Sequence, residues 1–296
     1  MDITNILNKR FNEMKQEEEN HLKKRERILY HIIPLKYFLD ALKDGHLNFS
    51  SVGRWAKEYD AYEMITDHMY MQVVDGCDGH VENVLFPQLS DETYAMSWTN
   101  ASESAYMWDE YAKDENAVRL GIKWGDIEDA LMRKYQSLHN LTEVDAKDAR
   151  RNAYAMLEVE YFPKNEIIKL RNNTHFEPSA TLIPECIEFL RLKRLAFKCE
   201  REVRGVIYCS DEHKKEEKSE FLHIPIHFLS TIKSITFHPN LDEDSIERIK
   251  HQIQERVHFS DDVFKKSCIK LKGKKISKPS SETKKELPPP VIYGVK

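Results

Sequence analysis

The chain has 296 residues, of which 41% are hydrophobic and 32% are charged, so it can build a hydrophobic core and is neither fibrous nor wholly disordered. Its net charge of −5 argues against a general affinity for the phosphate backbone of nucleic acids. Five scattered cysteines without zinc-site spacing, and the lack of a signal peptide or a long apolar run, predict a protein of the reducing cytoplasm.

The beginning of the sequence predicts a helix followed by a strand, a second helix and a second strand. Apolar residues at helical spacing, with a charge-rich continuation, indicate an amphipathic helix over residues 1–27. The apolar run 28–33 predicts a strand, Pro34 begins a helix that Gly45 ends, and residues 46–50 predict the next strand.

The rest of the chain predicts strands mixed with helices. In chain order the expected elements are a loop at 51–60, a helix at 60–74, a turn at 75–80, a strand at 93–98, a helix capped by Ser102, a strand at 117–124, a helix at 126–156, a strand at 157–162, a helix at 184–197, strands at 198–209, 221–226 and 231–237, and a helix at 241–257. Because strands and helices do not alternate strictly, this order predicts an α+β fold.

The C-terminal end of the chain differs in composition from the rest. Residues 265–285 carry nine lysines and one acidic residue. We expect a single α+β domain over 28–271 and a flexible basic tail over 272–296 that ends in a proline-rich apolar peptide. The lysine-rich stretch is either a solvated charge run or a binding segment for nucleic acid or a protein partner.

Three charged residues in the predicted strand 198–209 are candidates for chemistry. Glu200, Glu202 and Arg204 are two residues apart, so in one strand their side chains share a face. One interpretation is a polar face on which Arg204 pairs with Glu202. The other is a carboxylate held rigidly beside a sugar, where it stabilises the positive charge that develops as a glycosidic bond breaks.

Several histidine and aromatic residues also have two interpretations. His31, within an apolar strand, is either a hydrogen-bonded core residue or a ligand of a ribose hydroxyl. Trp55, Trp98, Trp108 and Tyr111 either belong to the core or stack on a planar ring. The sequence has no Gly-rich phosphate loop, no Gly-x-Ser-x-Gly elbow and no His-Glu-x-x-His motif.

The order of several short motifs resembles a bacterial family of unknown function, number twenty-nine seventy-one of the domain-of-unknown-function series. The resemblance covers residues 28–270, and three family positions are not kept, since Asn and Pro are missing before Tyr62 and Glu110 replaces a histidine. It rests on Tyr30 and His31, on Gly45, Leu47, Phe49 and Ser50, on Asp60, Tyr62 and Glu63, on Met107, Trp108, Tyr111 and Ala112, on Val159 and Tyr161, and on Lys193, Phe197, Glu200, Glu202 and Arg204.

That family in turn resembles ADP-ribosyltransferases, which implies a split β-sandwich that uses NAD as its substrate. The resemblance implies that His31 binds the ribose region and that Glu202 is the catalytic carboxylate, with Glu200 assisting. It also implies that the middle residue of the NAD-binding triad is one of Ser50, Ser51, Tyr59 and Tyr62, and Arg204 is a further expected contact to NAD.

Three functions are compatible with these observations. The first is an NAD-dependent ADP-ribosyltransferase that transfers ADP-ribose to a protein or nucleic acid, as a toxin or a phage-defence effector without a membrane partner. The second is a non-catalytic module of the same fold that senses a nucleotide or binds a partner through residues 265–285. The third is a nuclease in which Asp60, Glu63, Glu200 and Glu202 hold Mg²⁺, the only one of the three that needs a metal.

Overall fold

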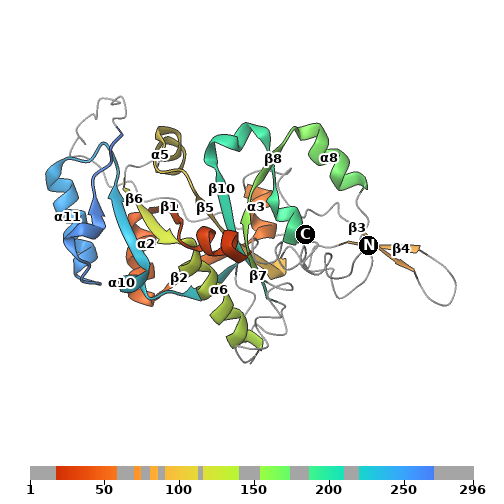
Figure 1. The fold of residues 1–296 in the computed structure, drawn as a ribbon, viewed down its shortest axis with the longest axis horizontal. Coiled ribbons are helices and arrows are strands. Elements are labelled where there is room, and N and C mark those ends of the chain that lie inside the picture. Colours follow the sequence, from red (N-terminus) through yellow and green to blue (C-terminus); the bar gives the residue numbers. More distant parts are fainter. Residues whose placement is uncertain are drawn as a thin grey trace, which may run out of the picture.

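The computed structural model is built around one large sheet with helices on both of its faces (Figure 1). Among the parts of the chain that the structure describes, no helix has the length and apolar character needed to cross a bilayer. The described residues are 18–58, 70–74, 81–85, 91–112, 116–139, 154–173, 187–209 and 220–269.

The large sheet has nine strands and is mixed, because β12 and β13 run parallel whereas its other pairs are antiparallel. In spatial order its main path is β11 (Phe221–Pro225), β2 (His46–Ser51), β5 (Thr93–Thr99), β1 (Ile28–Pro34), β6 (Ala117–Lys123), β12 (Ile232–Phe237) and β13 (Phe264–Lys265). Off this path, β5 also pairs with β10 (Glu202–Tyr208), which pairs in turn with β7 (Tyr154–Glu158). Two smaller sheets join β3 (Tyr70–Val74) to β4 (Val81–Leu85) and β8 (Glu160–Phe162) to β9 (Leu192–Arg194).

The sheet divides at β5. Strand β10 pairs with β5 along its whole length, while β2 pairs only near Ala95 and β1 only at Thr99. Two arms, β2–β11 and β1–β6–β12–β13, therefore leave β5 at different points along the strand. The mixed α+β fold is confirmed, and the split β-sandwich remains a prediction.

The helices lie between and beside these strands. The α-helices are α2 (Leu35–Asp44), α3 (Val52–Glu58), α5 (Ala105–Tyr111), α6 (Trp124–His139), α8 (Lys164–Asn173), α10 (Phe228–Thr231) and α11 (Glu243–Gln254). The 3-10 turns are η1 (Phe189–Arg191), η2 (Leu195–Glu200) and η4 (Asp261–Val263). In α2, Leu35, Phe38 and Leu42 recur at helical spacing and are buried, and Gly45 ends the helix with φ 76°, a left-handed conformation that glycine adopts without steric cost.

The two faces of β10 pack against different clusters of apolar side chains. Val203 and Ile207 belong to the main core, which α2, α6 and α11 help to build. Val206, on the opposite face, joins a smaller cluster with Val52 of α3 and Leu190 of η1. Since successive residues of a strand point to opposite faces, Glu202 and Arg204 share the face of Val206.

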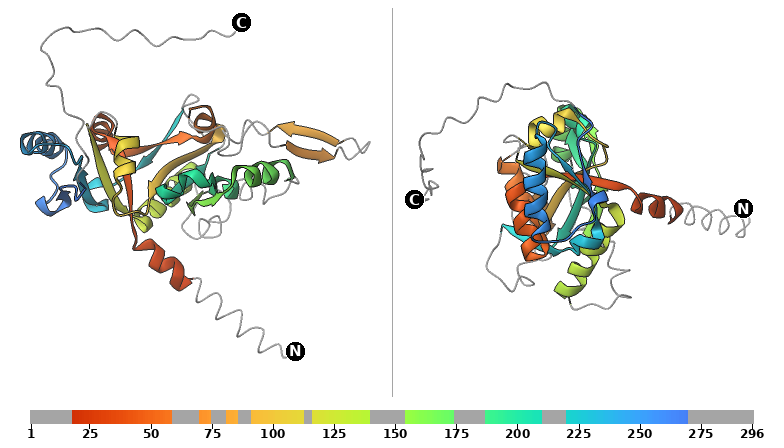
Figure 2. Two further views of the ribbon diagram at one scale, coloured as in Figure 1. Left: turned by 90° about the horizontal axis from the view of Figure 1, so that it is seen from above. Right: turned by 90° about the vertical axis from the view of Figure 1, so that its left-hand side faces the viewer.

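A helical segment precedes β1 and is attached to the sheet region by charged contacts. Residues 18–25 are helical, and Figure 2 shows this segment leading away from the sheet. At its last turn Arg25 forms ion pairs with Glu128 and Asp129 of α6, and Lys24 pairs with Glu158 of β7. The helix predicted over residues 1–27 is thus present at 18–25, and residues 1–17 lie outside the described residues. The basic tail 272–296 lies outside them, so the division of the chain at 28–271 remains a prediction.

Most of the strands that the sequence predicts are confirmed. The structure has strands where residues 28–33, 46–50, 93–98, 117–124, 221–226 and 231–237 predict them, and helices after Pro34 and near 241–257.

Five expectations about local structure are wrong. Residues 52–58 are a helix instead of a loop, and 70–74 are a strand instead of a helix. Helix α5 has Ser104 at its N-cap instead of Ser102. The helix expected at 126–156 is present as α6 over Trp124–His139, but its expected end is wrong because 154–158 form β7. The helix expected at 184–197 is wrong, because η1, β9 and η2 occupy 189–200. The expected turn at 75–80 lies outside the described residues.

Candidate active site

Arg204 and Glu202 form an ion pair near the beginning of β10. Arg204 Nε and Nη2 donate to the two carboxylate oxygens of Glu202 at 2.8 and 3.1 Å, and Nη1 donates to the Leu190 carbonyl at 2.8 Å. The Arg204 side chain is fully buried and that of Glu202 is 5% exposed. Such a two-point contact fixes the orientation of the carboxylate as well as its charge.

Lys193 of β9 joins this pair to a second carboxylate. Its Nζ donates to Glu200 Oε2 at 2.6 Å and to Glu202 Oε2 at 2.9 Å. We call Lys193, Glu200, Glu202 and Arg204 the charged quartet. Because it contains two carboxylates and two cations, its formal charges cancel, as burial of ionised groups requires.

Three hydroxyl groups surround the charged quartet. Ser97 Oγ of β5 donates to Glu202 Oε1 at 2.5 Å, and Tyr111 Oη of α5 donates to Glu200 Oε1 at 2.9 Å. Tyr161 Oη of β8 accepts a hydrogen bond from the backbone N–H of Glu202 at 2.8 Å. The Glu202 carboxylate therefore accepts four hydrogen bonds and the Glu200 carboxylate accepts two from the described residues.

The electrostatics of the site keep Glu202 ionised and the nearby tyrosines protonated. Burial raises the pKa of Glu202, but the charges of Arg204 and Lys193 and the hydrogen bonds from Arg204 and Ser97 overcome this effect and bring the pKa to about 2. Burial, followed by the negative charge of Glu200, raises the pKa of Tyr111 far above its ordinary range. Burial raises the pKa of Tyr161 to about 12.

A left-handed residue brings the two glutamates together. Glu200 is the last residue of η2, Glu202 is the first of β10, and Arg201 between them has φ 46°, a conformation that non-glycine residues rarely adopt. The prediction that both glutamates lie on one strand is wrong. They nevertheless meet at Lys193, because the chain changes direction at Arg201.

His31 lies on the opposite face of the sheet from Glu202. Tyr30 and Glu202 are both opposite Thr99 in register, so these three side chains share one face and His31 takes the other. There His31 Nδ1 donates to the Ser97 carbonyl at 2.8 Å, and its ring lies 5.4 Å from that of Trp98. The expectation that His31 and Glu202 face one shared cavity is therefore wrong. Burial lowers the pKa of His31 to about 4, so the ring is neutral at pH 7.

Only some of the residues predicted to bind NAD lie near the charged quartet. Ser50 Oγ accepts a hydrogen bond from Trp55 Nε1, and the ring of Trp55 lies 5.4 Å from the Arg204 guanidinium, so Ser50 reaches the quartet through Trp55. Ser51 is buried opposite Tyr94, at the other end of β5 from Thr99. Four residues of the prediction lie outside the described residues: Tyr59, Asp60, Tyr62 and Glu63.

Of the four aromatic candidates, two lie in the core and two contact the charged quartet. Trp98 and Trp108 are core residues, with 2% and 0% of their surface exposed. Tyr111 and Trp55 contact the charged quartet.

Sequence reasoning assigned no role to Lys193, Ser97 or Tyr161. Lys193 belongs to the motif of the resemblance, and its spacing from Glu200 and Glu202 is the only signal that pointed to it. Ser97 comes from β5, whose register with β10 decides that it meets Glu202, and Tyr161 comes from β8, whose register with β9 places it opposite Lys193. A single sequence does not contain either register.

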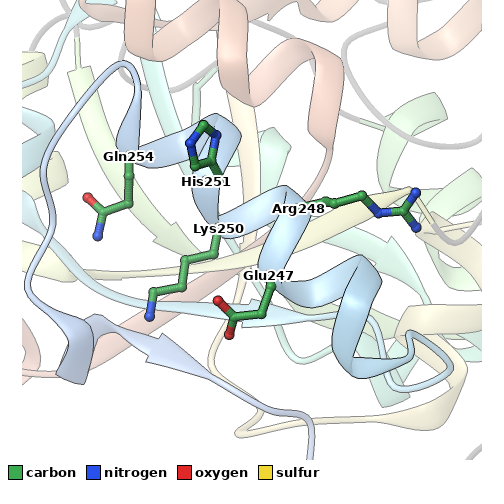
Figure 3. A pocket seen from close by; sticks show the side chains of 5 residues that line it. All are labelled: Glu247, Arg248, Lys250, His251 and Gln254. Carbon is green, nitrogen blue, oxygen red and sulfur yellow. The ribbon is translucent and has the colours of Figure 1, made fainter.

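No metal site supports the nuclease hypothesis in the described ranges, where no three His, Cys, Asp or Glu residues are grouped as metal ligands would be. Glu200 and Glu202 are instead paired with cations. Figure 3 shows a surface hollow on α11, lined by Glu247, Arg248, Lys250, His251 and Gln254. Helix α11 lies at the left end of the molecule in Figure 1, whereas β10 lies near its middle, so this hollow is not part of the charged quartet.

Comparison with known proteins gives structural matches only. No protein-family model matches the sequence, and no curated protein is detectably similar to it. Three structures of DarT from Thermus sp. 2.9 are similar. The complex with ADP-ribosylated ssDNA has 8% identity and a TM-score of 0.36 over 82% of this chain and 94% of that chain. The complex with NAD+ has 10% identity and a TM-score of 0.33, over 82% and 96% of the two chains, and the complex with carba-NAD+ has 9% and 0.32, over 81% and 95%. The resemblance to family twenty-nine seventy-one thus remains a prediction.

Proposed function

We propose that this chain is an ADP-ribosyltransferase-like enzyme that cleaves the nicotinamide–ribose bond of NAD and transfers ADP-ribose to a macromolecule. The observation that carries the proposal is the pair of buried carboxylates of Glu200 and Glu202, which Lys193 joins and which Arg204 helps to hold in place. A fixed anion stabilises an oxocarbenium-like transition state without having to reorganise during the reaction. A role as a toxin or phage-defence effector belongs to the same proposal.

The number of hydrogen-bond donors favours a division of labour between the two glutamates. All four lone-pair positions of the Glu202 carboxylate are taken by Ser97, Lys193 and Arg204. Among the described residues, Glu200 accepts only from Lys193 and Tyr111, so two positions can still meet a ribose hydroxyl or a developing positive charge. The sequence assigned catalysis to Glu202 with Glu200 assisting. The geometry favours Glu200 as the carboxylate that faces the sugar and Glu202 as the residue that fixes Lys193 and Arg204.

Access to Glu200 involves Tyr111. The hydroxyl of Tyr111 donates a hydrogen bond to Glu200 Oε1, and 42% of the surface of Tyr111 is exposed. A substrate that approaches from α5 therefore contacts the Tyr111 ring first and displaces its hydroxyl from Glu200. The exposed ring also offers a face on which a planar base can stack.

The test is release of nicotinamide from NAD by the purified protein, compared among wild type, Glu200→Gln, Glu202→Gln and Glu188→Gln. Glu188 is a matched control, because it is an exposed glutamate of the same region whose only described ion pair is with Arg191. We expect Glu200→Gln to lower the turnover rate at least a hundredfold and Glu188→Gln to leave it unchanged. Equal rates for wild type and both quartet variants would refute the proposal, and so would a wild type that releases no nicotinamide.

A non-catalytic module of the same fold is the second candidate. It is favoured by the low exposure of the charged quartet, whose two glutamate side chains are each 5% exposed. Such a neutral, nearly closed cluster also suits a purely structural role. A protein that binds a nucleotide without turning NAD over, in wild type and in every quartet variant, would support this candidate.

A further inference from the structure

A second buried arginine lies on the same face of the sheet as Glu202 but lacks a carboxylate partner. Arg119 of β6 is 6% exposed. Within the described residues its guanidinium makes one hydrogen bond, from Nη2 to the Ala101 carbonyl at 2.9 Å, and no ion pair. Its Cζ lies 3.5 Å from the ring centroid of Tyr30. Arg204, in contrast, has Glu202 as a two-point partner.

The environment of Arg119 leaves its positive charge poorly compensated. Burial lowers the pKa of Arg119, which shows how strongly this position disfavours the charge. The carboxylate of Glu103 lies in the vicinity, but it accepts hydrogen bonds from Trp108, Ser267 and Cys268 instead. A buried guanidinium without a bonded anion is costly, so such a position calls for an anionic ligand.

The unused donors of Arg119 are not sealed inside the protein. None of its nitrogen atoms belongs to the buried polar atoms that lack a hydrogen-bond partner in the described part of the chain. Its remaining N–H groups therefore reach space that solvent or a ligand can enter. Thr236 of β12 lies directly opposite Arg119 in register and is 5% exposed, so its side chain, which carries a hydroxyl group, is next to that of Arg119 on the same face.

The backbone segments around Arg119 are held in place by several contacts. Strand β13 pairs with β12, and the segment that follows it is tied to the loop before α5 by the hydrogen bonds of Ser267 and Cys268 to Glu103. The same loop supplies the Ala101 carbonyl that orients Arg119. A site framed in this way is arranged before a ligand arrives, which lowers the cost of binding.

The register also places Arg119 relative to the charged quartet. Glu202, Thr99, Tyr30 and Gly121 form a row across four adjacent strands, and Arg119 lies two residues from Gly121 on the same face. Adjacent strands are about 4.8 Å apart, so the backbone of β6 lies roughly 14 Å from that of β10. An extended dinucleotide spans this separation.

We propose that Arg119, supported by the Thr236 hydroxyl and the Tyr30 ring, binds the diphosphate group of a nucleotide. The planar guanidinium presents paired donors that match phosphate oxygens, and Tyr30 holds its plane in place. That the nucleotide is NAD rests on the proposed function, whereas the diphosphate site itself does not.

The test is calorimetric titration of the full-length protein with ADP, with inorganic pyrophosphate and with adenosine. We expect wild type to bind ADP and pyrophosphate, and adenosine more weakly than ADP. Arg119→Gln should weaken ADP binding at least tenfold, which corresponds to about 1.4 kcal/mol. Arg248→Gln is the matched control, since Arg248 is an exposed arginine of α11, and it should bind ADP as wild type does. Wild type that does not bind ADP, or Arg119→Gln that binds it equally well, would overturn the proposal.

Two further variants keep the test decisive if Arg119→Gln does not fold. Arg119→Lys keeps the charge but loses the paired donors, and Thr236→Val removes only a hydroxyl. Both should weaken ADP binding severalfold, and unchanged affinity in both would overturn the site. Glu200→Gln separates the two proposals, because it should lose nicotinamide release yet still bind ADP. ADP binding that depends on Arg119 without any NAD turnover would therefore refute the enzyme and leave the diphosphate site standing.

Discussion

Replacing Glu202 by glutamine should destabilise the protein strongly at neutral pH. Glutamine keeps the size of the side chain but removes the negative charge that Lys193 and Arg204 share. Lys193 retains Glu200 as a partner, whereas Arg204, which is fully buried, keeps only the Leu190 carbonyl and the Trp55 ring among these contacts. The variant therefore removes the carboxylate that holds two nitrogen atoms of the buried Arg204 guanidinium.

The size of the effect follows from the pKa of Glu202. This pKa is about 2 in the folded chain against an ordinary value of 4.5. Each whole step of pKa difference between the folded and unfolded chain is worth about 1.4 kcal/mol, so the ionised carboxylate contributes about 3 kcal/mol. Removing one partner of a buried ion pair typically costs about 3–5 kcal/mol, which agrees. We expect the free energy of unfolding to fall by about 3 kcal/mol at pH 7.

The pH dependence supplies a second check with a defined sign. The folded-state pKa is lowered, so the contribution of Glu202 is fully present above about pH 4.5 and is lost as the pH falls toward 2. The stability difference between wild type and Glu202→Gln should therefore narrow below pH 4.5.

Urea denaturation followed by tryptophan fluorescence measures this difference. Glu188→Gln, which breaks an exposed ion pair with Arg191, should cost less than about 0.5 kcal/mol and serves as the control. A loss below about 1 kcal/mol for Glu202→Gln at pH 7, or a loss that stays constant down to pH 3, would show that the carboxylate is not held as the structure indicates.

Three further predictions concern neighbouring residues. His31→Gln should flatten the decline of stability between pH 6.5 and 4, because burial lowers the pKa of His31 to about 4 and the unfolded chain takes up the proton first; an NMR titration in which His31 titrates near 6.5 would contradict this. Ser97→Ala should cost about 1–2 kcal/mol in urea denaturation, because it removes a hydrogen bond to an ionised carboxylate, and no measurable cost would argue against that bond. Gly121→Ala should cost about 1–3 kcal/mol, because a Cβ atom there meets Ser234 Oγ and lies 3.1 Å from Tyr30 Cε1; a melting temperature equal to that of wild type would refute this packing.

The part of the fold that could be predicted is the part in which local pattern and local structure agree. The run from Ile28 to Ser51 combines an apolar strand, Pro34 before a helix and Gly45 after it, and the structure follows this order. Helix α11 was predictable for the same reason, since Ile246, Ile249 and Ile253 recur at helical spacing and all three are buried. In these segments no distant contact opposes the local preference.

The prediction failed where distant contacts decide the backbone. The pattern at 184–197 predicts a helix, but β9 pairs with β8 and so replaces helix by strand at Lys193. The reversal at Arg201 is equally invisible in the sequence, because the left-handed region usually selects glycine or asparagine. The pattern therefore indicated one long strand where the structure has a 3-10 turn, a reversal and a strand.

The candidate site shows the same division at the level of side chains. Spacing alone predicted that Glu202 and Arg204 share a face, because strand periodicity is local. It placed His31 with them wrongly, because a register in which Tyr30 lies opposite Thr99 sends His31 to the other face. A shift of one residue in the register of β1 would move His31 to the face of Glu202, and the packing of the whole sheet sets that register.

The contrast between the two buried arginines is the feature of this face that bears most on function. Arg204 and Arg119 lie on the same face, yet Arg204 has Glu202 as a two-point partner while Arg119 forms no ion pair within the described residues. A purely structural role would favour pairing both, since an uncompensated buried charge lowers stability. A fold that neutralises one buried arginine and leaves the other without an ion pair offers a position for an anion, and the row from Glu202 to Gly121 extends from the carboxylates toward it.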